Sequence, residues 1–335
     1  MPVARMLPNT ESEDLLALVT EIARDELAPK AAEYEASGTF PRESFRLLGK
    51  SGLLGLPYEE RWGGGAQPYE VYLQALEEIA AAWMTMGIGL SVHTMSCFGL
   101  AHFGDAAQRQ RWLPDMLGGE LLGGYSLSEP QAGSDAGALA TKAVRNESGY
   151  RISGTKAWVT NGGQVDYYTL MARTSAEDIS CFLIDADTEG LRAATPERKM
   201  GLSGSPTTQL ILSDVGVTQD RRIGAEGRGL RIALESLNSG RLGIAACAVG
   251  LAQAALDEAV AYTSTRTQFG SAIIDFQGME FLLADMAAAV GAARSSYLDA
   301  ARRRDRGMAF VREASIAKLV ATDAAMKVTT DAVQA

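Results

Sequence analysis

The spacing of apolar residues changes twice along this chain, and that change constrains the fold more than any other feature. Residues 1–120 carry apolar side chains at helical spacing, residues 121–227 alternate with a period of two, and residues 228–335 return to helical spacing. Strands that are grouped together between groups of helices predict separate helical and β domains rather than alternating βαβ units. We therefore predict three domains, divided after residues 120 and 227.

The first region predicts three helical runs. Thr10 and Glu13 form a capping-box pattern at the start of the first run. The second run begins near Pro68 and continues through a glycine-containing apolar stretch. Asp105 is the predicted N-cap of the third run, and the Gly118-Gly119 pair is its predicted end.

The middle region contains four short runs rich in β-forming residues: YRISGTKAWVT, VDYYTLMAR, SCFLIDAD and TTQLILSDVGV. Asn, Gly, Asp and Pro separate them, a pattern that predicts a small all-β domain. The last region contains long alanine-rich amphipathic segments at 228–268, 276–304 and 312–335, which predict a helical bundle. The expected fold class is mainly α with a central β domain.

Composition argues against two classes of partner. A net charge of −10 repels the phosphate backbone of nucleic acids. The basic cluster at Arg302, Arg303, Arg304 and Arg306 follows a long helical pattern, so we interpret it as a solvated face that complements the carboxyl end of a helix. No uninterrupted apolar run approaches the ~20 residues that span a bilayer. We therefore expect neither a nucleic-acid partner nor a membrane.

The cysteines and the N-terminus bear on the compartment. Cys97, Cys181 and Cys247 are odd in number, far apart and surrounded by apolar residues, as expected of small buried hydrophobes in a reducing environment. The N-terminal sequence MPVARMLPNTESEDLL lacks the apolar core of a secretory signal. Together these features predict a cytoplasmic protein.

The chain lacks the usual signatures of several enzyme classes. It contains no GxGxxG after a strand, no P-loop and no GxSxG nucleophile elbow. His93 and His102 are nine residues apart in an apolar helical stretch without a companion carboxylate or cysteine cluster. We interpret both histidines as structural, which argues against a zinc enzyme or a histidine-based hydrolase.

Three segments carry the residue types of a ligand site. The loop YSLSEPQAGSD, residues 125–135, offers N–H groups and serine hydroxyls to a ligand, or forms an ordinary surface loop. In TKAWVTNGG, period two places Trp158 and Thr160 on one face of a strand, where they suit a flat heterocycle; a core tryptophan is the alternative. In RTQFG, Arg266 and Phe269 lie one helical turn apart, and the guanidinium either neutralises a helix end or binds a pyrophosphate.

The order of these segments resembles the acyl-CoA dehydrogenase family from end to end of the chain. The matching motifs are, in order, YSLSEPQAGSD, ISGTKAWVTNGG, KMGLSGSPT, LNSGRLGIAACAVGLAQAALDEAVAYTSTRTQFG, FQGMEFLLADM, ASIAK and TDAVQ. The resemblance implies an N-terminal helical domain, a small β-barrel or β-sandwich, and a C-terminal four-helix bundle. It also implies FAD as the cofactor, a homotetramer built as a dimer of dimers, and a role in fatty acid metabolism.

The resemblance further implies roles for particular residues. The residues at FAD-binding positions are Tyr125, Leu127, Ser128, Ser134, Trp158, Thr160, Arg266, Phe269, Gln277 and Gln334, of which the last four reach into a neighbouring subunit. The residues at substrate-side positions are Ser134, Asn238 and Arg241. The implied reaction is α,β-dehydrogenation of an acyl-CoA thioester to the trans-2-enoyl-CoA, with electrons passed to an electron-transfer flavoprotein.

The catalytic base departs from the family pattern. Most members carry this glutamate in a tail beyond the DAVQ helix, whereas this sequence stops at Ala335; a minority carry it before the arginine of the GR step, where this chain has Gly240. We therefore expect a truncated dehydrogenase whose base lies in a missing tail and whose 335-residue form turns over acyl-CoA negligibly. The alternatives are a flavin oxidase or monooxygenase of the same fold, and a non-catalytic subunit of a hetero-oligomer.

Overall fold

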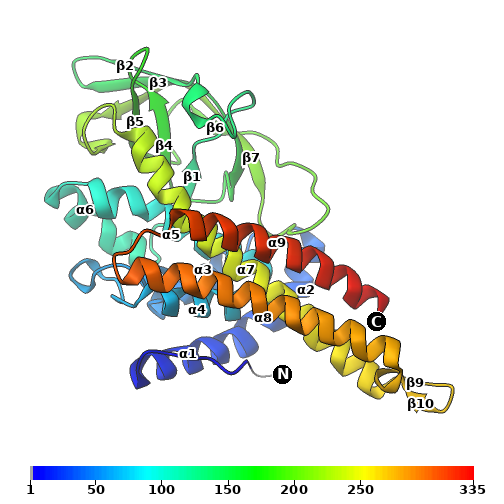
Figure 1. Cartoon of the computed structure of the whole chain (residues 1–335). Coiled ribbons are helices and arrows are strands. Elements are labelled where there is room, and N and C mark those ends of the chain that lie inside the picture. The colour runs from blue at the N-terminus through cyan, green and yellow to red at the C-terminus, as the bar shows by residue number, and fades with distance from the viewer. Residues whose placement is uncertain (1–2) are drawn as a thin grey trace. The chain divides into compact units, whose positions relative to one another are not determined.

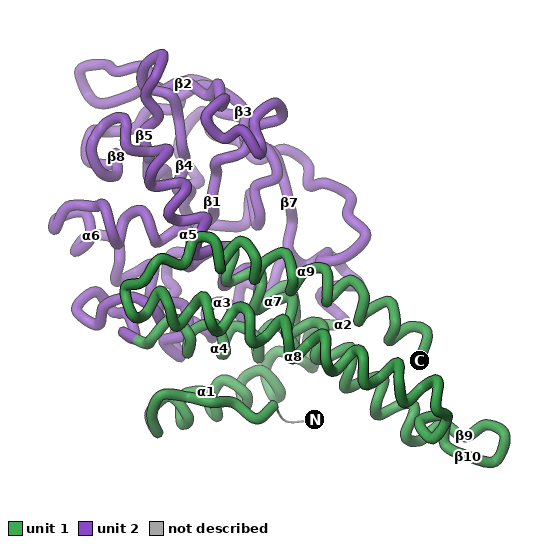
Figure 2. The backbone as a smooth tube through the Cα atoms, viewed as in Figure 1, with its two compact units in different colours: residues 1–31, 67–88, 241–335 green, residues 32–66, 89–240 purple. Residues whose placement is uncertain are grey.

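The computed structural model describes residues 3–335, and its chain divides into two compact units (Figures 1 and 2). Unit 1 comprises residues 1–31, 67–88 and 241–335, and unit 2 comprises residues 32–66 and 89–240. Helices at both ends of the chain and strands between them confirm the predicted fold class, a mainly α protein with a central β region. The domain boundaries after residues 120 and 227 stay a prediction.

Unit 1 is built mainly from helices. Those that lie wholly within it are α1 (Thr10–Ile22), α4 (Tyr69–Ala82), α8 (Gln277–Asp305) and α9 (Val311–Gln334). The division between the units falls within α2 (Ala28–Ser37), α5 (Met84–Phe103) and α7 (Gly229–Thr265). A π-helical turn at Ala23–Leu27 follows α1, and a hairpin of β9 (Thr267–Gln268) and β10 (Ser271–Ala272), with a 3-10 turn at Ile273–Asp275, separates α7 from α8.

Helix α4 provides much of the core of unit 1. Leu73, Leu76 and Ile79 recur on one face at helical spacing, and all three are completely buried. Helix α4 packs against α1 and α8, and α8 packs against α9. Three long helices, α7 to α9, occupy the described residues from 229 onward, so the implied count of four is not reached within this sequence.

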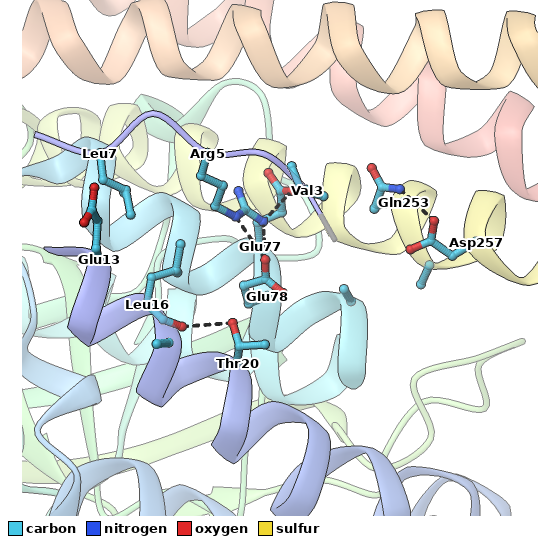
Figure 3. Close-up of a pocket in the computed structure, with 13 residues that line it drawn as sticks. Val3, Arg5, Leu7, Glu13, Leu16, Thr20, Glu77, Glu78, Gln253 and Asp257 are labelled. Carbon is cyan, nitrogen blue, oxygen red and sulfur yellow. Dashed lines mark hydrogen bonds and ion pairs between the residues drawn. The ribbon is translucent and has the colours of Figure 1, made fainter. Parts of the chain in front are cut away.

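Buried charges connect α4 to the N-terminal segment and to α8 within unit 1. Glu77 of α4 is 1% exposed and accepts a hydrogen bond from Arg5 at 2.9 Å (Figure 3). It also accepts hydrogen bonds from Arg294 (2.9 Å) and from the hydroxyl of Tyr297. Burial opposes its ionisation, but the two arginines outweigh burial and lower the pKa of Glu77 below its usual range. Arg5 and Glu77 line a cavity of about 410 Å³ together with Glu78, Gln253 and Asp257.

The carboxyl end of α8 differs from the solvated basic face that the sequence predicted. Asp305 accepts hydrogen bonds from the backbone N–H groups of Tyr69 (2.8 Å) and Glu70 (3.0 Å), so it caps the first turn of α4 from far away in the sequence. Arg302 pairs with Glu70 at 2.6 Å, and the guanidinium of Arg304 lies 3.5 Å from the centre of the Tyr69 ring. Pro68 offers α4 no side-chain cap, and Asp305 supplies one, while Arg302 and Arg304 contact side chains of the same first turn.

Unit 2 contains one mixed sheet of eight strands. The strands are β1 (Gly123–Ser126), β2 (Lys142–Arg145), β3 (Gly149–Thr160), β4 (Tyr167–Arg173), β5 (Ile179–Asp185), β6 (Leu191–Ala193), β7 (Thr207–Thr218) and β8 (Arg222–Ile223). Their order is β6-β7-β3-β2-β4-β5-β8, with β1 parallel to β4. The four predicted β-rich runs are therefore confirmed as β3, β4, β5 and β7. The sheet buries a core that includes Tyr150, Ile152, Leu170, Phe182, Leu212 and Val217.

The remaining elements of unit 2 are short helices. They are α3 (Arg42–Lys50), α6 (Ala106–Gly118) and 3-10 turns at Leu53–Gly55, Glu60–Trp62, Ala136–Ala138 and Gln219–Arg221. The prediction for α6 is confirmed: Asp105 caps it, forms a capping box with Gln108, and is followed at the other end by Gly119 with φ 87°.

The predicted start of α1 is one residue wrong. Asn9 is the N-cap, and its side chain accepts a hydrogen bond from the N–H of Ser12 at 2.9 Å. Thr10 is already the first helical residue, so it forms no capping box with Glu13. Asparagine and threonine both favour this position, and asparagine is the stronger of the two.

Two helices are long and apolar enough to span a membrane by length and composition, α5 and α7. This differs from the expectation that no apolar run approaches that length. Half or more of the most apolar stretch of each helix is buried inside the fold, as in core helices of proteins without a membrane, so the finding is weak evidence for a span.

Candidate functional site

The loop at residues 125–135 leaves the sheet at the end of β1. Tyr125 is buried, and its hydroxyl donates to the backbone oxygen of Ala233 at 3.4 Å. Leu127 is also buried, Ser128 is partly buried, and Ser134 is exposed. The loop folds back on itself through a pair of backbone hydrogen bonds between Glu129 and Ala132. Ser126 is completely buried, so Ser128 and Ser134 are the serines of this loop that solvent reaches.

A buried ion pair connects this loop to β3. Lys156 is completely buried, Glu129 is 2% exposed, and Lys156 Nζ lies 2.8 Å from Glu129 Oε1. Burial lowers the pKa of Lys156 to about 8, against the opposing effect of Glu129. Burial alone would raise the pKa of Glu129, but hydrogen bonds from Lys156 and from residues 140 and 141 outweigh it and lower that pKa to about 2. The pair is therefore charged at neutral pH.

A β-bulge near the end of β3 determines where Trp158 points. Lys156 is opposite Leu210 of β7 and Val159 is opposite Thr208, so β3 carries one extra residue here. Trp158 has φ 57° and is 56% exposed, whereas Val159 is buried. The bulge interrupts the period of two on which the prediction of one shared face for Trp158 and Thr160 rested, and the partly buried Thr160 follows the buried Val159. The alternative of a core tryptophan is wrong.

The turn after Thr160 is held by a second loop of unit 2. Asn161, with φ 58°, donates its backbone N–H to Pro206 at 2.7 Å, and its side-chain oxygen accepts from the hydroxyl of Ser205 at 2.7 Å. Lys199 donates to the backbone oxygens of Leu202 and Ser205, which shapes that loop. The KMGLSGSPT segment therefore supports the end of the TKAWVTNGG strand.

The substrate-side positions lie on α7. Asn238 and Arg241 are partly buried, on either side of the division between the units. Gly240 lies in unit 2 beside Met95 of α5, whose Sδ is 2.7 Å from the point that a Cβ on residue 240 would occupy. A side chain at residue 240 therefore requires the flexible end of Met95 to move.

The remaining predicted site residues gather at one end of unit 1. The prediction that Arg266 and Phe269 lie one helical turn apart is wrong, because α7 ends at Thr265 and both residues belong to the β9–β10 hairpin. Phe269 and Gly270 have φ 51° and 84°, the left-handed pair of a tight hairpin turn. Helices α8 and α9 run antiparallel, so Gln277 and Gln334 lie at the same end of the pair as this hairpin (Figure 1).

His93 is structural, as predicted. The backbone N–H of Gly123 donates to its Nδ1 at 2.9 Å, so its proton is on Nε2, which donates to the backbone oxygen of Met116 at 3.0 Å. Burial lowers the pKa of His93 to about 4. Among residues 3–335, no group of three or more His, Cys, Asp or Glu side chains is placed to hold a metal ion. Cys97, Cys181 and Cys247 are all free and buried.

The residues assigned to FAD by resemblance fit that cofactor on two observations. Trp158 is a half-exposed indole held in a left-handed conformation by a bulge, a strained feature of the kind that gathers at ligand sites, and its flat face suits an isoalloxazine ring. The hydroxyls of Ser128 and Thr160 and the loop backbone supply hydrogen-bonding groups of the kind that a flavin's ring edge requires. In unit 1, the exposed Arg266 offers a guanidinium suited to a pyrophosphate.

The sequence analysis missed Lys156 and Glu129. Lys156 is an even number of residues from Tyr150 and Ile152, so all three side chains point to the buried face of β3. A lysine at such a position needs a buried partner. That signal was available in the sequence. The identity of the partner was not, because Glu129 lies 27 positions away in a loop.

Comparison with protein families finds a match along most of the chain. Residues 9–120 match "Acyl-CoA dehydrogenase, N-terminal domain", residues 124–215 match "Acyl-CoA dehydrogenase, middle domain", and residues 227–335 match "Acyl-CoA dehydrogenase, C-terminal domain". A Bacillus subtilis acyl-CoA dehydrogenase is 41% identical over 322 residues, covering 95% of this chain and 85% of the relative. A short-chain-specific acyl-CoA dehydrogenase of Clostridium acetobutylicum is 38% identical over 329 residues, covering 97% and 87%.

Solved structures with folds similar to that of this chain include further acyl-CoA dehydrogenases. Butyryl-CoA dehydrogenase from Megasphaera elsdenii superimposes with a TM-score of 0.95 at 36% identity, covering 99% of this chain and 89% of that one. A chain in the structure described as the electron transferring flavoprotein of Acidaminococcus fermentans gives 0.96 at 35% identity, covering 99% and 88%. A Mycobacterium smegmatis glutaryl-CoA dehydrogenase in complex with FADH2 gives 0.92 at 29% identity, covering 97% and 84%.

Proposed function

The chain belongs to the acyl-CoA dehydrogenase family, and on that premise we propose that it oxidises an acyl-CoA thioester to the trans-2-enoyl-CoA with FAD as its cofactor. The observation that carries the proposal is the exposed, left-handed Trp158 on the bulge of β3, next to a polar loop that the same strand holds. Relatives that act on short-chain acyl-CoA and butyryl-CoA support the substrate class.

When bound, FAD supplies the acceptor for the β-hydrogen of the substrate, which leaves as hydride while the α-proton goes to a base. Trp158 and Thr160 would hold one side of the ring, and Tyr125, Leu127 and Ser128 would hold another. Ser134, Asn238 and Arg241 would bind the CoA part of the substrate. Gly240, at one of the two family positions for the base, has no side chain that could accept the proton.

We propose that the four residues gathered at the hairpin end of unit 1, Arg266, Phe269, Gln277 and Gln334, bind the FAD of a neighbouring subunit. Their exposure supports this assignment, because Phe269 is 96% exposed in the single chain. Other large apolar residues exposed on α8 and α9 are Phe281, Val311, Ile316, Leu319, Val320, Met326 and Val333. Exposed apolar surface of this kind is typical of subunit interfaces, and we propose a homotetramer.

We propose that an electron-transfer flavoprotein accepts the electrons. The similarity to a chain in a structure described as an electron transferring flavoprotein supports this partner. We also propose a cytoplasmic location, which the free, buried cysteines support.

The decisive experiment follows the visible absorption of the purified, FAD-loaded protein without oxygen. Butyryl-CoA and longer acyl-CoA thioesters are added in turn, to the 335-residue chain and to a Gly240→Glu variant. Loss of the flavin absorption, followed by slow return in air and fast return with an electron-transfer flavoprotein, is the expected result for a chain that has a base. Fast return in air alone would instead identify an oxidase.

Two further results would contradict the proposal. A protein that takes up no FAD lacks the cofactor site, whatever its fold. A protein that binds FAD and acyl-CoA but shows no bleaching with a carboxylate at residue 240, and only becomes active with a second type of subunit, is the non-catalytic member of a hetero-oligomer.

A further inference from the structure

We propose that the buried Lys156–Glu129 ion pair positions the two flavin-binding segments of unit 2, and that it thereby controls FAD affinity and the flavin's spectrum. The two segments are residues 125–128 and residues 158–160. Lys156 and Glu129 act through the segments that they hold, so they are positioning residues, and the proposal rests on the FAD site proposed above.

Three hydrogen bonds join residues 127–129, at the end of the first segment, to residues 156 and 157, which immediately precede the second. Lys156 Nζ donates to the backbone oxygen of Leu127 at 3.0 Å and to Glu129 Oε1 at 2.8 Å. The backbone N–H of Ala157 donates to the backbone oxygen of Ser128 at 2.8 Å. Every residue from 127 to 129 is therefore held by residue 156 or 157, immediately before Trp158.

Glu129 is held as firmly as Lys156. Its Oε1 also accepts from the backbone N–H of Thr141 at 3.0 Å, and its Oε2 accepts from the backbone N–H of Ala140 at 2.6 Å and from Gln131 at 2.7 Å. The carboxylate thus joins the loop to the start of β2 as well as to β3. A carboxylate with this many donors is held in one orientation. Its hydrogen bond to Lys156 therefore fixes the position of the lysine Nζ as well.

The place of Lys156 in β3 makes its position important for Trp158. Lys156 is the last residue in register with β7 before the bulge, and register resumes at Val159. The bulge leaves residues 157 and 158 without a partner on β7, so the contacts of Lys156 and Ala157 with the loop fix where the bulge begins. A shift of Lys156 would move the loop and the indole together.

The energetics fit a positioning role better than a purely stabilising one. An ion pair that is completely buried contributes little net stability compared with a well-packed apolar pair, because both charges lose their hydration. It does supply directional bonds, which an apolar pair lacks. Directional bonds are what two segments need when both must contact one rigid ring.

The test uses the full chain with Glu129→Gln, Lys156→Met and a matched control, Glu226→Gln. Glu226 is in the same unit and accepts from Tyr150 and Arg222, both at 2.9 Å, but contacts neither flavin-binding segment through these bonds. Three quantities are measured for each protein: the stability of the apoprotein, the Kd for FAD by titration of the apoprotein, and the visible spectrum and midpoint potential of the bound flavin.

We expect at least a tenfold increase in the Kd for FAD in Glu129→Gln and Lys156→Met, with displaced flavin absorption bands. Glu226→Gln should keep the Kd within twofold of the wild type even where its apoprotein is less stable. If Lys156→Met fails to fold, the double variant Glu129→Gln/Lys156→Met, which leaves no unpaired buried charge, must show the same tenfold loss.

Two results would overturn the proposal. One is a Glu129→Gln protein with wild-type Kd and an unchanged spectrum. The other is a loss of FAD affinity that follows apoprotein stability in the same proportion in all variants, including Glu226→Gln. A wild-type protein that binds no FAD is a different result, since it removes the proposed cofactor site itself.

Discussion

Two carboxylates of this protein are almost inaccessible to solvent, Glu77 in unit 1 and Glu129 in unit 2, and both are paired with buried cations. Glu77 receives its bonds from Arg5, Arg294 and Tyr297, which belong to the N-terminal segment and to α8. Glu129 receives its bonds from a strand and a loop that adjoin the proposed flavin site. A buried, paired charge is thus not by itself evidence of a functional site, and the segments that it holds must be considered.

The largest expected effect on stability comes from Glu77, the buried carboxylate of unit 1. Glu77→Leu leaves the buried Arg294 without its carboxylate and removes one of the two carboxylates that pair with Arg5, so we expect the free energy of unfolding to fall by about 3–5 kcal/mol. Chemical denaturation of the apoprotein measures this loss. Glu78→Gln is the matched control, because Glu78 is 23% exposed and pairs with the same Arg5; it should cost about 1 kcal/mol.

A comparison of Glu77→Leu with Glu129→Gln sharpens the contrast between the two buried carboxylates. The folded fraction of Glu77→Leu should bind FAD with an unchanged Kd, whereas Glu129→Gln should not. Equal losses of FAD affinity in both variants would show that the two buried carboxylates do not differ in the way described above.

The second effect concerns acid stability in unit 2. His93 is neutral when folded, with a pKa of about 4 against about 6.5 when unfolded, so the unfolded state binds more protons between these values. The free energy of unfolding should therefore fall by about 3 kcal/mol as the pH drops from 7 to 4. Glu129, with its pKa of about 2 when folded against about 4.5 when unfolded, contributes fully above pH 4.5 and loses that contribution as the pH falls from there to about 2. His93→Gln should flatten the fall between pH 6.5 and 4 in denaturation curves; a fall of unchanged size would exclude His93 as its cause.

The third effect concerns the space at residue 240. Gly240→Glu pushes against Met95, and we expect a loss of about 1–3 kcal/mol in unfolding free energy. Met95→Ala in the same protein should recover most of that loss. Gly201→Glu is the control, because a Cβ there meets no described atom within 4 Å; thermal melting should detect a change of about 0.5 kcal/mol or less.

The smallest effect on stability should come from Trp158, a residue with a large proposed effect on the cofactor. Trp158→Gly relieves a left-handed conformation and removes a half-exposed side chain, so apoprotein stability should stay within about 1 kcal/mol of the wild type. The Kd for FAD should rise at least tenfold. Asp214→Gly, also left-handed with φ 55° and in the same unit, should leave the Kd unchanged. An unaltered Kd in Trp158→Gly would remove the indole from the proposed site.

Much of the fold was predictable from local pattern. The four β-rich runs became β3, β4, β5 and β7, and Asp105 capped α6, because period and caps depend on residues only a few positions apart. Local pattern failed at Arg266 and Phe269: their spacing predicted a helix, but the structure has a two-residue hairpin turn there. It also failed at Trp158, since a bulge depends on the register with a neighbouring strand.

The sequence by itself determined the order of helices and strands, the family, and the segments around Tyr125, Trp158 and Arg266 in which a site was sought. Only the tertiary structure showed that Lys156 pairs with Glu129, that Asp305 caps α4, and that Met95 fills the space beside Gly240. The physical reason is distance along the chain. Backbone hydrogen bonding within helices and the alternation of strands repeat over a few residues, whereas the partner of a buried charge depends on which distant surfaces pack together.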